Sequence, residues 1–68
     1  MKKVLVGIAG AGNVIRADSE PLSDDEARQQ LVDIIAAEEQ GPGALVKLPW
    51  LVVRASDVLF VRVLSLVA

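Results

Sequence analysis

The sequence predicts one small α+β domain, in which a single helix packs on one face of an antiparallel four-stranded sheet in the order β-β-α-β-β. Three observations predict this fold class. Runs rich in valine, isoleucine and leucine stand near both ends of the chain, a capped amphipathic segment lies between them, and turns containing glycine or proline separate them. At 68 residues the chain is long enough for one domain, residues 1–68, and too short for two.

The first two strands are expected to form a hairpin. Lys3–Ala9 is an apolar run rich in β-branched residues, and the turn formers Gly10–Asn13 follow it. Val14–Asp18 alternates weakly, as an edge strand facing water does. The glycines could instead open a dinucleotide-binding unit, because closely spaced glycines after a strand let amides approach a pyrophosphate. We favour the hairpin, since Pro21 arrives too soon for a helix that starts at the glycines.

The helix is predicted from the cap at Ser23 to the stop at Gly41–Gly43. Ser23 and Glu26 have the spacing of a capping box, and three acidic residues occupy the positive end of the helix dipole. The acidic cluster lacks the ligand spacing of a calcium loop, so we interpret it as a solvated helix start, with docking of a basic partner as the alternative. The stripe predicted to be buried comprises Ala27, Leu31, Ile34, Ile35 and Glu38.

Two further strands are predicted after the helix. Ala44–Val53 forms the third, with Pro49 as a bulge or an edge position, and Arg54–Asp57 forms a turn. Val58–Val67 forms the last strand and has no polar face. Since one helix covers only one side of a sheet, we expect the other side to meet a second subunit, a partner or a wrapped segment of the chain. The two predicted faces are Val58, Phe60, Leu64 and Leu66 on one side and Leu59, Val61, Val63 and Val67 on the other.

The composition argues against enzymatic and metal chemistry. The chain has no cysteine and no histidine, which removes disulfides, thiol chemistry and the usual zinc and iron ligands. A serine nucleophile would also lack its common base. We therefore expect no enzymatic activity, no cofactor and no metal site.

Charge and hydropathy limit the partners. The formal net charge of −2 makes nucleic acid an unlikely partner. Charged residues and a proline interrupt residues 44–68, so this apolar segment does not read as a membrane span. Lys2 and Lys3 before a short apolar run resemble a signal peptide, but the apolar run is too short, and we expect a cytoplasmic protein that is not cleaved.

These observations predict a small interaction or structural accessory protein that forms a homo-oligomer through an apolar sheet face or an edge. We also allow for a further protein partner. A phage or mobile-element origin would fit such a protein. The alternative is a nucleic-acid-binding regulator in which assembly aligns Arg16, Lys47 and Arg54. Trp50 fits a core or sheet-face position, and it is also a candidate interface anchor because tryptophan is favoured at interface centres. A lone arginine on an apolar strand needs a partner or the sheet rim. The candidate interface residues are Trp50, Leu59, Phe60, Val61, Arg62 and Val63.

Overall fold

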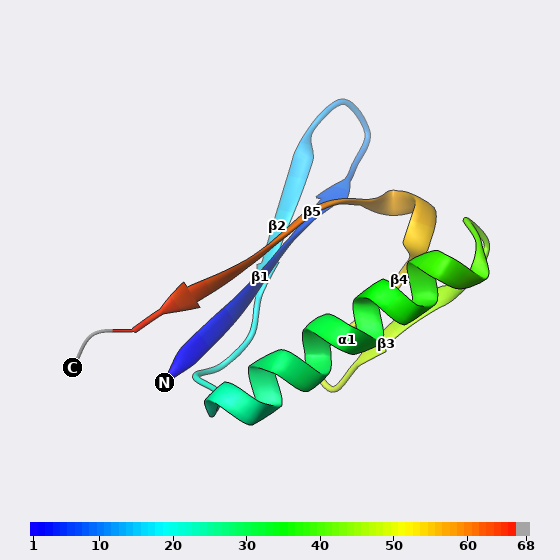
Figure 1. Ribbon diagram of the computed structural model, residues 1–68. Coiled ribbons are helices and arrows are strands. Elements are labelled where there is room, and N and C mark those ends of the chain that lie inside the picture. Colours follow the sequence, from blue (N-terminus) through cyan, green and yellow to red (C-terminus); the bar gives the residue numbers. More distant parts are fainter. Residues whose placement is uncertain (67–68) are drawn as a thin grey trace.

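The computed structural model describes residues 1–66 and confirms a mixed α+β fold with one helix and antiparallel sheets (Figure 1). It corrects the prediction of one four-stranded sheet, because the strands form a three-stranded sheet in the order β2-β1-β5 and a separate two-stranded sheet, β3-β4. We call these sheet A and sheet B. The elements in chain order are β1 (Lys2–Ala9), β2 (Val14–Asp18), α1 (Asp24–Gln40), β3 (Leu45–Leu48), β4 (Leu51–Arg54), the short 3₁₀ helix η1 (Ala55–Asp57) and β5 (Val58–Ser65).

The two sheets arise because residues 44–53, predicted as one strand, fold back on themselves. Leu48 pairs with Leu51, so Pro49 and Trp50 form the turn of a hairpin, and Pro49 is neither a bulge nor an edge position. Proline suits this place because its ring fixes φ at the second residue of a tight turn. The chain then passes through η1, where the Ala55 amide donates to the Ala44 carbonyl at 2.8 Å, and β5 returns to pair with β1.

The predicted hairpin and helix boundaries are confirmed. Between β1 and β2, the Gly10 amide donates to the Asn13 carbonyl at 2.8 Å, which closes the turn. At the helix start, the Ser23 side chain accepts from the Glu26 amide at 3.2 Å, and the Glu26 carboxylate accepts from the Ser23 amide at 3.4 Å. The helix ends at Gly41, whose φ of 124° favours glycine.

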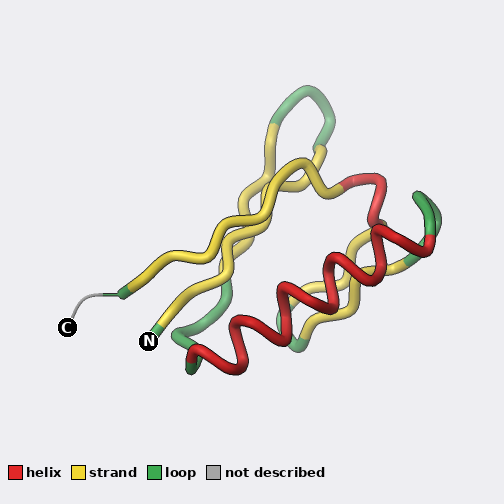
Figure 2. Tube along the Cα trace, viewed as in Figure 1, coloured by secondary structure: helices red, strands yellow, loops and turns green. Residues whose placement is uncertain are grey.

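The core lies where sheet A, α1 and the β3–β4 hairpin meet, since α1 and the hairpin lie on the same side of sheet A (Figure 2). The buried face of α1 differs from the predicted stripe. Ile35 is 46% exposed and Glu38 is exposed, because the helix turns its buried side toward β3 as well as β1. The buried apolar residues are Val4, Val6, Ala27, Ile34, Ala37, Val46, Leu48 and Ala55.

A β-bulge near the start of β5 changes the predicted faces of this strand. The register with β1 shifts between Gly7, which pairs with Phe60, and Ile8, which pairs with Val58. Leu59 is therefore the extra residue, and Val58 packs against the core with Val61 rather than facing outward with Phe60. Residue 67, predicted as part of this strand, lies outside the described residues. Within residues 1–66, no helix has both the length and the apolar character needed to cross a membrane.

Candidate functional site

The two edges of sheet A differ in how they are protected from pairing with another strand. The β2 edge is five residues long and carries Arg16 and Asp18, and Pro21 follows it. The β5 edge is eight residues long, contains no proline and carries only one charge, Arg62. Short edges, charges and prolines are the features by which proteins prevent edge pairing. The bulge at Leu59 interrupts the β5 edge near its start, which leaves the stretch after it as a regular, uncovered edge.

The backbone groups on this free edge can be assigned from the hydrogen bonds of β1. The amide and carbonyl of Lys2 both bond to Leu22, on the β2 side of β1. Because these groups alternate along an antiparallel strand, Lys3, Leu5 and Gly7 direct theirs toward β5. Their partners on β5 are Leu64, Arg62 and Phe60, and the Leu66 amide continues this series by donating to Met1 at 3.0 Å.

The intervening residues of β5 therefore direct their amides and carbonyls away from the sheet. These residues are Val61, Val63 and Ser65, and within residues 1–66 their backbone groups have no hydrogen-bond partner. A row of unpaired donors and acceptors of this kind is a template for another strand.

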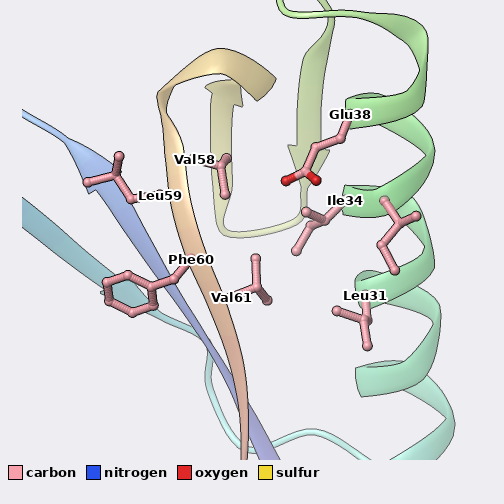
Figure 3. Close-up of a pocket in the computed structure, with 8 residues that line it drawn as sticks. Leu31, Ile34, Glu38, Val58, Leu59, Phe60 and Val61 are labelled. Carbon is pink, nitrogen blue, oxygen red and sulfur yellow. The ribbon is translucent and has the colours of Figure 1, made fainter.

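An apolar groove lies between β5 and α1 (Figure 3). Val58 and Val61 point from β5 toward Leu31, Ile34 and Glu38 on the helix. A second hollow continues the groove toward the start of α1, since Leu31 lines both. This second hollow is lined by Lys2, Asp24, Ala27, Arg28, Leu31 and Val63. The groove therefore borders the free edge along most of β5, and we call it the β5 groove.

The opposite face of sheet A, which we call the outer face, is apolar only in part. The Phe60 ring lies directly over Gly7, where a side chain of any size would overlap the ring. Arg62 stacks on this ring, with its guanidinium carbon 5.6 Å from the ring centroid. Lys3 and Asp18 form an ion pair at 3.5 Å on the same face. Charged side chains thus lie between the apolar ones on the outer face.

The structure separates the six candidate residues predicted from the sequence. Val61 and Val63 line the β5 groove, Phe60 and Arg62 lie on the outer face, and Leu59 is the bulge residue, 53% exposed. All five belong to one strand.

Trp50 lies apart from these five. It is half-buried, and its indole amine donates to the Gln30 side-chain oxygen at 2.9 Å. Its other neighbours include Leu22 and the acidic end of β2, at the edge of sheet A opposite to β5.

Sequence reasoning placed Leu31 and Ile35 in the core and therefore missed them as groove residues. Leu31 is half-buried and Ile35 is 46% exposed. Their signal was present in the sequence, because both belong to the apolar stripe of the helix, but the pattern does not say which part of the stripe stays uncovered.

The basic residues of the alternative function do not form one surface in a single chain. Arg16 lies on the outer face of sheet A, whereas Lys47 and Arg54 lie on the exposed face of sheet B. The basic residue that accompanies Arg16 is Arg62, since both line a hollow beside Phe60.

Comparisons with family models, curated proteins and solved structures give no match for this chain. Its function is therefore inferred from β5 and its surroundings.

Proposed function

We propose that this chain is a non-enzymatic protein that self-associates through β5 and works as an interaction or structural accessory protein. The observation that carries the proposal is the free edge of β5, which carries a single charge, Arg62, and is not covered by another element of the described residues. Four large apolar side chains are exposed in this part of the chain, Leu59, Val63, Leu64 and Leu66. Large apolar side chains exposed together along one stretch of chain are typical of an association site.

The edge and its groove are better suited to association than the outer face. The outer face would bring Lys3, Arg16, Asp18 and Arg62 into any contact, and desolvating them costs free energy unless each finds a partner. The charged side chains of the β5 groove, Lys2, Asp24, Arg28 and Glu38, lie on β1 and α1 rather than on β5. Along β5 itself the groove presents Val61 and Val63 together with unpaired backbone groups, and a second strand would satisfy both.

The small core gives a further reason for association. The four largest fully buried side chains are those of Val4, Val6, Ile34 and Val46, none larger than isoleucine. Small domains bury a limited fraction of their surface, and a partner that binds only the folded state adds stability by mass action. Burying apolar surface between copies would thus compensate for the modest core.

Sedimentation velocity and light scattering across the micromolar range test this proposal. A single chain has a mass of 7.2 kDa, and we expect twice that mass or more as the concentration rises. The melting temperature should rise with concentration too, because association stabilises the folded chain. A mass of 7.2 kDa at every concentration would contradict the proposal.

Nucleic-acid binding is the second candidate, and one observation favours it. Arg16 and Arg62 flank Phe60 on the outer face, where the nearby carboxylate of Asp18 is already paired with Lys3. Arginines beside an aromatic ring are a common element of single-strand binding surfaces. A gel-shift measurement at physiological salt would support this function if wild-type protein retards the nucleic acid and Arg16→Ala does not.

A further inference from the structure

The uncovered position of β5 conflicts with its amino-acid pattern. A strand that is apolar on both faces is normally a central strand, covered on both faces and paired on both edges. In one chain, however, β5 is the last strand of the order β2-β1-β5. A second copy of β5 would make it central, because the joined sheet would run β2-β1-β5-β5-β1-β2.

We infer that β5 pairs antiparallel with β5 of a second copy about a two-fold axis at Val63, with both β5 grooves meeting at the axis. This inference rests on the proposed self-association and adds the strand, its direction and its register. The result is a closed dimer with one isologous interface, the commonest arrangement of homo-oligomers.

The hydrogen-bonding pattern selects the register. With the axis at Val63, the outward groups of Val63 meet their own copies, and those of Val61 meet those of Ser65. All three outward-facing residues then form backbone hydrogen bonds. An axis at Val61 would instead place the bulge residue Leu59 in the ladder, where pairing is interrupted.

The charge of β5 selects the same register. An axis at Arg62 would place two guanidinium groups directly opposite each other, which destabilises a strand pair. With the axis at Val63, Arg62 lies opposite Leu64 of the second copy, and the only charge of the strand avoids its own copy.

The groove wall beside Val63 supplies charge complementarity between two copies. Asp24 and Arg28, one helical turn apart, line the same hollow as Val63. A two-fold axis at Val63 brings the Asp24 wall of each copy toward the Arg28 wall of the other. The helix side of the hollow, with one acid and one base, is therefore matched to a second copy of itself, while Lys2 adds a base on the strand side.

The absence of cysteine makes a cross-linking test direct. In the inferred register, residues 62 and 64 of different copies form a non-hydrogen-bonded pair, whose Cα atoms lie about 4.5 Å apart, a spacing that a disulfide can bridge. The variants Arg62→Cys and Leu64→Cys are prepared separately, and each is checked for native circular dichroism. They are mixed in equal amounts with oxidised glutathione as the oxidant, and the disulfide dimer is followed on non-reducing gels.

We expect the mixture to form the linked dimer faster than either variant alone. The control Val52→Cys, 63% exposed on sheet B, measures random collision. The mixture should exceed the control by about 100-fold, because two thiols held at an interface react at a far higher effective concentration. Fastest linking in Arg62→Cys alone would overturn the register at Val63.

A charge-reversal series provides an independent test. Arg28→Asp should weaken the dimer, since two acids then meet across the axis, and the double variant Asp24→Arg/Arg28→Asp should restore it. A dimer unaffected by Arg28→Asp and not linked in the cysteine mixture would overturn this pairing while leaving self-association standing. A wild-type chain that stays monomeric would overturn both proposals and leave the edge to a strand of another protein.

Discussion

Replacing Trp50 by phenylalanine separates an internal role of this residue from a role at an interface. The Trp50 indole amine donates to the side-chain oxygen of Gln30 at 2.9 Å. Gln30 is 8% exposed, so water cannot easily replace the lost donor. Phenylalanine keeps an aromatic ring at this position and removes the amine.

The expected loss follows from the burial of the acceptor. Leaving a buried polar atom without its partner costs about 1–3 kcal/mol. The phenylalanine ring is also smaller and buries less apolar surface than tryptophan. Because Trp50 is only half-buried, this second loss is small compared with the burial of a whole side chain. We therefore expect Trp50→Phe to lower the free energy of unfolding by about 2 kcal/mol. For a domain of this size, that loss lowers the melting temperature by about 10 °C.

Urea unfolding followed by far-ultraviolet circular dichroism measures this loss without relying on tryptophan fluorescence. The double variant Trp50→Phe/Gln30→Met removes both hydrogen-bonding partners, and it should recover about 1 kcal/mol relative to the sum of the single variants. The mass in solution should stay that of wild type, because Trp50 lies away from β5. A loss below about 0.5 kcal/mol without coupling would refute the internal role, and a change in mass would identify Trp50 as an interface residue.

Three further substitutions test the fold around the site. Ser19→Ala should destabilise the chain by about 1–3 kcal/mol, because the buried Ser19 hydroxyl accepts from the Val4 amide at 3.0 Å; urea unfolding measures this. Gly7→Val should displace the Phe60 ring and cost about 1–3 kcal/mol, and proton chemical shifts of the ring should move; an unchanged ring environment would contradict the contact. Ser23→Ala removes the helix cap and should lower the free energy of unfolding by about 1 kcal/mol. Ser56→Ala is the control, because Ser56 is also exposed, and it should change this free energy little.

The local elements could be predicted from the sequence because short-range chemistry determines them. The capping box of Ser23 and Glu26 marks the helix start, and Gly41 marks its end, and both positions agree with the structure. The first hairpin was predicted from the glycines between two β-branched runs, and the turn closes through Gly10 and Asn13.

The second hairpin could not be predicted in the same way. Two-residue hairpin turns are usually recognised by Asn-Gly or similar pairs with positive φ. Pro49 and Trp50 do not match this signal, and no residue other than glycine has a positive φ among the described residues. Residues 44–53 therefore look like one strand, and this error merged two sheets into one.

The candidate site could be predicted only as far as the strand that forms it. The alternation of side chains along residues 58–66 indicates which residues share a face, but the bulge at Leu59 shifts Val58 to the other face, and no residue type signals that bulge. Alternation also contains no information on strand order.

The strand order decides which part of an apolar strand stays exposed. The prediction left open whether association uses a sheet face or an edge, and the strand order places β5 at an edge, beside the β5 groove. An exposed face lacks only apolar contacts, but an exposed edge also lacks hydrogen-bond partners, and these have a fixed spacing and direction. Association through β5 should therefore be specific in register even though its side chains are chemically similar. For this reason, the position of cross-links between Arg62→Cys and Leu64→Cys tests the structural reasoning more sharply than the mass of the assembly.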